Sequence, residues 1–289
     1  MQYSATTVMM PELSMEEQAA LLQRLGFDGA EWRVRRVTPE QRGKGYSNWG
    51  KHKNDLDPDN FAANAARMKQ VAADHGLKIA GIASAPGADD LDDIKRLAEG
   101  AAACGAPFFR VWCPRWYDGT VDYNVLYDES VEAFGKALDA IAGSGVKIAL
   151  EIHGGTIHPS ASLGYRIVSH WPADRICCIF DPQNMVRDGF ETTELALELL
   201  GDYVGHVHAG GHQPVETGRD ELGTAEWDWP GVPMADGLYD FRRLLKKLKA
   251  IGYQGFISVE DFRPAPVEEK LKNGIEYLRA VEASLERIS

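Results

Sequence analysis

The sequence lacks an excess of basic residues and any long apolar run, and each absence argues against a class of protein. Its 289 residues carry 31 Lys and Arg against 43 Asp and Glu, a net charge of −12, with no block of basic residues. This balance disfavours nucleic acid and anionic membranes as partners. No apolar run reaches the roughly 18 residues of a membrane helix, and the N-terminus lacks the pattern of a signal peptide. We therefore expect a soluble, cytoplasmic protein.

Cysteine is scarce as well. The four cysteines have neither the spacing of a zinc site nor the density of a disulfide scaffold. Cys177 and Cys178 are adjacent in an apolar strand and must face opposite sides of it. We predict that the cysteines are buried free thiols.

What the sequence does contain is a repeated unit of amphipathic helix, glycine turn and short apolar strand. After an opening strand near residues 3–9, the turn-and-strand pieces are RLGFDGAEWRV, DHGLKIAGIAS, CGAPFFRVWC, GSGVKIALEIH, DRICCIFDP, LGDYVGHVHAG and IGYQGFISVED. The composition does not change along the chain. The pattern predicts an α/β fold, a single (β/α)₈ TIM barrel formed by residues 1–289 as one domain.

Helices are expected between these strands. Ser14 and Glu17 have the spacing of a capping box for a helix over Met15–Leu25. Apolar residues follow one helical face in residues 241–251 and another in residues 267–288, up to Ile288. The other helices are expected at about residues 59–75, 90–104, 123–142, 160–171 and 192–200. The longest connections, residues 35–58 and 210–240, follow strand ends, where TIM barrels carry their sites.

Four residues with metal-binding side chains stand at the ends of four successive predicted strands. They are Glu151 (LEIH), Asp181 (FDPQN), His208 (HVHAGG) and Glu260 (SVED), all expected at the same level of the barrel. Three carboxylates crowded together repel one another strongly without a cation. The donor set predicts one divalent ion, Mn²⁺ first, with Mg²⁺, Co²⁺ and Zn²⁺ as alternatives. The competing interpretation is four unrelated residues held by arginines or helix ends.

Other residues are candidates for catalysis or substrate binding. His153 shares a strand face with Glu151, so it is either a catalytic base or a support for that carboxylate. Arg110 and Trp112 share a face in FFRVWC and could hold a substrate oxygen and stack on a substrate ring. A structural ion pair is an equal alternative for Arg110. Arg219, in the second long connection, is a further substrate-binding candidate.

Several residues have simpler interpretations. His206 lies one layer deeper than His208, so a core or supporting role is favoured, although we keep it as a substrate-binding candidate. Glu31 and Arg33 share a strand face and are expected either to pair or to contact substrate. The histidines at positions 52, 158, 170 and 212 are expected at the surface, although those at 158 and 212 lie in loops on the active face.

The motifs LEIH, FDPQN, HVHAGG and SVED, in this order, make the chain resemble the sugar phosphate isomerase/epimerase superfamily. These xylose isomerase-like TIM barrels (AP endonuclease family 2) include ketose 3-epimerases, inosose dehydratases, hydroxypyruvate isomerase and endonuclease IV. The resemblance covers essentially the whole chain and implies that Glu151, Asp181, His208 and Glu260 bind the metal. One departure is Asn184, which stands where the family often has a histidine and which we keep as a substrate-binding candidate. Strands two and three also lack the extra histidines of endonuclease IV, which argues against DNA repair.

The resemblance implies a mechanism. A metal that chelates a carbonyl and a neighbouring hydroxyl acidifies the adjacent C–H and stabilises the resulting enediolate. In the epimerases that this chain resembles, the two ligand glutamates move the proton, and these map onto Glu151 and Glu260. The first interpretation is therefore a metal-dependent isomerase or epimerase of a keto-sugar or polyol.

Two other functions stay open. One is a metal-dependent lyase, either a dehydratase or a C-glycoside deglycosidase acting on 3-keto-glycosides, the latter with a small partner subunit in some relatives. The other is a non-catalytic barrel that binds a sugar. Most of the seven tryptophans lie near the active face and no glycine-rich phosphate cradle is present, which favours an unphosphorylated sugar or glycoside. The sequence leaves a homo-oligomer open.

Overall fold

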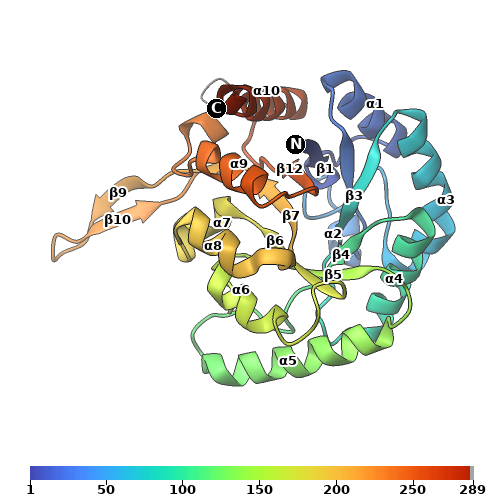
Figure 1. Ribbon diagram of the computed structural model, residues 1–289, viewed down its shortest axis with the longest axis horizontal. Coiled ribbons are helices and arrows are strands. Elements are labelled where there is room, and N and C mark those ends of the chain that lie inside the picture. The colour runs from blue at the N-terminus through green and yellow to red at the C-terminus, as the bar shows by residue number, and fades with distance from the viewer. Residues whose placement is uncertain (287–289) are drawn as a thin grey trace.

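The computed structural model describes residues 1–286 and shows a closed barrel of eight parallel strands surrounded by helices (Figure 1). Around the barrel the strands follow the order β1-β12-β7-β6-β5-β4-β3-β2. They are β1 (Gln2–Thr6), β2 (Gly29–Arg33), β3 (Lys78–Ala83), β4 (Phe108–Arg110), β5 (Lys147–Glu151), β6 (Ile176–Phe180), β7 (Val204–Ala209) and β12 (Phe256–Val259). The predicted (β/α)₈ barrel is confirmed.

The strands are apolar because both of their faces are buried. Every residue of β6 is buried, and its outer face packs into the large core between the barrel and the helices. Inside the barrel, Phe108, Ala149, Cys177 and Ile179 form a separate small core. This layer fills the barrel below the carboxyl ends of the strands and provides a floor for polar side chains above it.

Most helices begin and end as their sequences predict. The capping box at Ser14 is present, and Gly26 ends the first helix in the left-handed conformation with φ 79°. Ile288 lies outside the described residues. The helices are α1 (Met15–Leu25), α2 (Pro39–Arg42), α3 (Pro58–Asp74), α4 (Leu91–Cys104), α5 (Tyr123–Ala140), α6 (Ala161–Val168), α7 (Pro182–Asp188), α8 (Thr193–Leu200), α9 (Phe241–Ala250) and α10 (Val267–Glu286), with 3₁₀ turns η1 (Thr7–Met9), η2 (Gly201–Tyr203) and η3 (Met234–Asp236).

The connection after β7 contains more structure than the sequence predicted. Two short strands, β8 (Gly211–His212) and β11 (Gly231–Val232), pair at its base. Beyond them β9 (Val215–Arg219) and β10 (Ala225–Asp228) form an antiparallel hairpin that projects away from the barrel (Figure 1). Its turn uses Gly223 at φ 82°, a conformation that glycine adopts without strain.

Two predictions from composition can also be compared with the structure. All four cysteines are buried free thiols, as predicted. Among the described helices, none combines the length and the apolar character that crossing a bilayer requires.

Candidate metal centre and the pocket above it

The four predicted metal ligands meet at the carboxyl ends of their strands. Glu151 ends β5 and His208 lies near the end of β7, whereas Asp181 and Glu260 directly follow β6 and β12. One potential ligand atom from each residue lies within 4.8 Å of the others, and all four side chains are buried. The parallel register therefore brings together residues that are far apart in the sequence.

His208 stands at the centre of this group. Its Nδ1 atom lies 3.1 Å from Glu151 Oε1, 3.2 Å from Glu260 Oε2 and 3.4 Å from Asp181 Oδ2. Three carboxylates and one imidazole nitrogen that converge in this way form a donor set for a divalent cation. These buried residues could hold one metal ion.

The charges around the group show why a cation suits it. Arg110 Nη1 donates to Glu151 Oε2 at 2.5 Å. Burial alone would raise the pKa of Glu151, but Arg110 and then His208 lower it below its ordinary value. Burial would lower the pKa of His208, yet the carboxylates, led by Glu260, raise it well above the usual range. Burial raises the pKa of Glu260. The arginine thus compensates one carboxylate and leaves a surplus of negative charge.

Two side chains from α7 hold the carboxylates in place. Gln183 Nε2 donates to Glu260 Oε2 at 2.9 Å, and Asn184 Nδ2 donates to Asp181 Oδ2 at 2.6 Å. Asp181 also caps α7, because its Oδ1 accepts from the backbone N–H of Asn184 at 3.1 Å. The segment FDPQN therefore supplies a ligand candidate, its helix cap and two supporting amides.

A cavity of about 300 Å³ opens above the carboxylates. Its polar lining includes both glutamates of the group, and its walls are largely aromatic. The lining residues are Arg35, Trp49, Arg110, Trp112, Trp116, Glu151, His153, Gln183, Asn184, His212, Glu260 and Phe262. The volume lies at the small end of the range for ligand pockets, about 300–1,000 Å³.

Two aromatic groups form the walls of this cavity. In the first group, the rings of Trp112 and Trp116 lie 5.2 Å apart, and His153 meets Trp112 edge-on at 5.1 Å. In the second group, Trp49 packs against Phe262 with ring centroids 4.6 Å apart. Flat apolar faces above a charged floor suit the C–H surface of a sugar ring.

Comparison with known proteins places the chain in a family. Residues 19–281 match the family described as xylose isomerase-like TIM barrel. The chain belongs to this family. No match is found among curated proteins.

Several solved structures share the barrel fold of this chain at low sequence identity. The apo form of 3-keto-D-glucoside 4-epimerase YcjR from E. coli is 16% identical, with a TM-score of 0.69, over 97% of this chain and 99% of that one. The probable 3-DHS dehydratase AsbF from Bacillus anthracis is 14% identical, with a TM-score of 0.73, and the match covers 96% of this chain and 99% of that one. The IOLI protein with a bound zinc atom is 18% identical, with a TM-score of 0.70, and the match covers 97% of this chain and 98% of that one.

Within this family barrel, several predicted site residues line the pocket. His153, Arg110, Trp112 and Asn184 all do so. His153 Nδ1 lies 2.6 Å from the carbonyl oxygen of Gly154. Because a carbonyl oxygen only accepts hydrogen bonds, Nδ1 carries the proton, and the lone pair of Nε2 is left to accept a proton or a hydrogen bond. Arg110 forms the structural ion pair with Glu151 and also faces the pocket.

Two substrate-binding candidates lie elsewhere. His206 is fully buried beneath the pocket, where its ring packs 5.1 Å from that of Phe108. Arg219 lies on the projecting hairpin, where its Nε is 3.0 Å from Glu216 Oε1, and it does not line the pocket. The sequence placed Arg219 in a connection on the active face, but the hairpin carries it outward.

Other expectations were wrong. Glu31 and Arg33 do not pair, because Glu31 faces His208 inside the barrel whereas Arg33 Nη2 donates to the carbonyl oxygen of Gly50 at 2.7 Å. His52 and His158, expected at the surface, are buried. Both lie in connections between secondary-structure elements, which look exposed in sequence, but each side chain is buried when the chain folds.

Sequence reasoning also missed residues of the pocket wall. Arg35, Phe262 and Gln183 line the cavity without having been singled out as candidates. Gln183 carried a usable signal, since it lies inside the FDPQN motif. Arg35 and Phe262 stand just beyond strand ends, and only the folded chain brings both of them against Trp49.

Proposed function

We propose that this protein is a divalent-metal-dependent sugar isomerase or epimerase that moves a proton next to the carbonyl of a keto-sugar or polyol. The observation that carries the proposal is the convergence of Glu151, Asp181, His208 and Glu260, two of which, Glu151 and Glu260, line an aromatic-walled pocket. Sugar epimerases with the same fold, such as 3-keto-D-glucoside 4-epimerase and D-allulose 3-epimerase from Methylomonas sp., support it.

The metal would be held by these four residues, with Mn²⁺ as our first choice. When bound, a divalent ion polarises a substrate carbonyl and so acidifies the neighbouring C–H. Glu151 and Glu260 come from strands on either side of β6 and β7 in the barrel order, so their carboxylates face a substrate from two directions. One would remove the proton and the other would return it.

The remaining pocket residues would orient the substrate. Trp112 and Trp116 offer aromatic faces for a sugar ring, and His153 Nε2 is placed to exchange hydrogen bonds with a hydroxyl. Arg35 stacks over Trp49, its guanidinium carbon 5.7 Å from the ring centroid. We propose that the substrate is an unphosphorylated sugar or glycoside bound between these walls.

A lyase is the second candidate. The similarity to the probable 3-DHS dehydratase AsbF favours it, because elimination starts with the same proton abstraction. Its products differ, since a β-substituent leaves instead of the proton returning. A non-catalytic sugar-binding barrel is disfavoured because all four ligand candidates are present.

The test measures metal content by mass spectrometry and C–H exchange in D₂O with a panel of keto-sugars. We expect one Mn²⁺ per chain in the wild type and exchange on at least one sugar. Glu260→Gln should lower exchange by about 10²–10⁴-fold, the usual contribution of a general base. Glu99→Gln, an exposed glutamate on α4, is the control and should behave like the wild type.

The products then separate the two candidate functions. A new sugar isomer supports the isomerase or epimerase, and a dehydrated or cleaved product supports the lyase. A wild-type protein that binds metal but catalyses no exchange would contradict both.

A further inference from the structure

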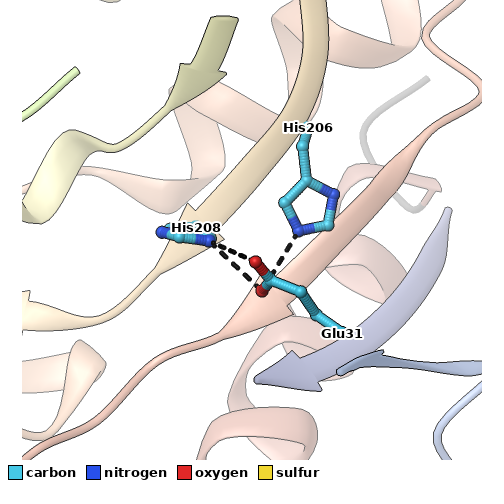
Figure 2. A group of neighbouring side chains, drawn as sticks. All are labelled: Glu31, His206 and His208. Atoms are coloured by element: carbon cyan, nitrogen blue, oxygen red, sulfur yellow. Dashed lines mark hydrogen bonds and ion pairs between the residues drawn. The ribbon is translucent and has the colours of Figure 1, made fainter. Parts of the chain in front are cut away.

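A fourth buried carboxylate lies behind the candidate metal centre. Figure 2 shows Glu31, from β2, pointing at His206 and His208 of β7 across the barrel. His208 Nε2 lies 3.3 Å from Glu31 Oε1 and 3.2 Å from Oε2, and His206 Nε2 lies 3.5 Å from Oε2. All three side chains are fully buried and none lines the pocket. Glu31 therefore cannot reach a substrate in the pocket.

The two ring nitrogens of His208 face different groups. Nδ1 faces the carboxylates of Glu151, Asp181 and Glu260, and Nε2 faces Glu31. A neutral imidazole has one N–H and one lone pair, and only the lone pair can bind a metal. A carboxylate that accepts a hydrogen bond from Nε2–H leaves the lone pair on Nδ1, directed at the other three ligands.

We infer that Glu31 is a positioning residue that fixes the tautomer and the ring orientation of His208 for metal binding. This inference rests on the proposed metal centre. Glu31 is itself held by Ser258, whose Oγ donates to Oε2 at 3.0 Å from the strand paired with β7. Carboxylates behind metal-binding histidines also increase the basicity of the ligand, and losing such a partner typically weakens metal binding 10–100-fold.

The same three residues could alternatively hold a metal of their own, since their potential ligand atoms lie within 4.8 Å of one another. Geometry argues against this. A second ion would need the Nε2 lone pair of His208, and one imidazole that binds metals through both nitrogens would have to lose its remaining proton. In addition, the three side chains are fully buried and do not line the pocket. We treat a second ion as an outcome of the test.

The experiment compares metal binding and the His208 tautomer in the wild type, Glu31→Gln, Glu31→Ala and Glu99→Gln. Titration calorimetry of the metal-free proteins with Mn²⁺ should give one site per chain. We expect Kd to rise about 10–100-fold in Glu31→Ala and by less in Glu31→Gln, whose amide oxygen still accepts a hydrogen bond. Glu99→Gln should match the wild type.

A spectroscopic readout separates positioning from a loss of fold. In the Zn²⁺-loaded wild type, ¹H–¹⁵N spectra of the histidine rings should show His208 protonated at Nε2. Glu31→Ala should lose that protected Nε2–H while its circular dichroism stays native. Ser258→Ala, which frees Glu31 without removing it, should show a smaller rise in Kd.

Three results would overturn the inference in distinguishable ways. Unchanged Kd and an unchanged Nε2–H signal in both Glu31 variants would show that Glu31 does not position His208. Two ions per chain in the wild type and one in the Glu31 variants would make the cluster a metal site instead. A wild type that binds no ion would remove the proposed function together with the inference.

Discussion

At the scale of single residues, this protein buries ionisable groups that most proteins keep in water. Glu151, Asp181, Glu260 and Glu31 are all buried, and Arg110 is the one arginine bonded to any of them among the described residues. A buried charge is costly unless it is paired or binds a cation. Such a concentration of carboxylates is consistent with the proposed metal binding and proton transfer.

A buried histidine in the loop after β5 should make the protein sensitive to acid. Burial lowers the pKa of His158 to about 3, and among the described residues neither ring nitrogen has a hydrogen-bond partner. In the unfolded chain His158 binds a proton at about pH 6.5, whereas in the folded chain it stays neutral until a much lower pH. The free energy of unfolding therefore falls as the pH drops below about 6.5. At pH 5 this difference costs about 2 kcal/mol.

Replacing His158 with leucine should remove this loss. We expect the free energy of unfolding of His158→Leu, relative to the wild type, to improve by about 2 kcal/mol between pH 7 and pH 5. Urea denaturation at both pH values measures it. The exposed His170 provides the matched control, His170→Leu. A parallel loss of stability in His158→Leu and the wild type would contradict the prediction.

At the scale of elements, strands and helices have separate tasks. The strands deliver site residues at their carboxyl ends, and the register sets their level; for example, Ser258 lies beside His208. The helices pack around the barrel and keep it closed. The contact between α3 and α4 is close because Gly100 receives the ring of Phe61, and a Cβ at position 100 would lie 2.3 Å from Phe61 Cδ1.

A methyl group at this contact should destabilise the protein. We expect Gly100→Ala to lower the free energy of unfolding by about 1–3 kcal/mol, because the ring or the helix must shift. Gly135→Ala is the matched control on α5, since its Cβ would lie 3.7 Å from Trp171 Cζ2, an ordinary contact. That substitution should stabilise by about 0.5–1 kcal/mol through helix propensity. Equal effects in urea denaturation would show that the α3–α4 contact is not tight.

At the scale of the whole molecule, barrel closure makes the site. It brings Glu31 of the second strand against His208 of β7 and brings Arg35 and Trp49 of an early loop to the same pocket as Trp112. Folding must bring three carboxylates together, and their repulsion opposes it. An ion that binds this arrangement therefore stabilises the entire fold.

Metal binding should raise the melting temperature of the whole barrel. At a Mn²⁺ concentration of 100 times Kd, the folded state gains about 2.7 kcal/mol. Differential scanning calorimetry with and without Mn²⁺ measures the shift. The same titration of Asp181→Asn, which removes one carboxylate charge, should show a smaller shift. An equal shift in both proteins would indicate that Mn²⁺ binds elsewhere.

The sequence by itself determined the barrel and the level of the candidate metal centre. Apolar strands with glycine turns alternate with amphipathic helices along the chain, and eight such units in one domain are typical of a (β/α)₈ barrel. Glu151, Asp181, His208 and Glu260 were predictable as neighbours because each stands at the end of a strand. In a parallel barrel all such ends meet on one face, so their convergence needs no knowledge of side-chain packing.

Only the tertiary structure decided what surrounds that centre. The contact of Glu31 with His208, the burial of His158 and the outward position of Arg219 depend on contacts across the barrel and on loop paths. No local periodicity encodes these, because a loop residue's burial is set by whatever segment folds over it. The role of Glu31 was hidden for the same reason: its partner lies 177 residues away along the chain.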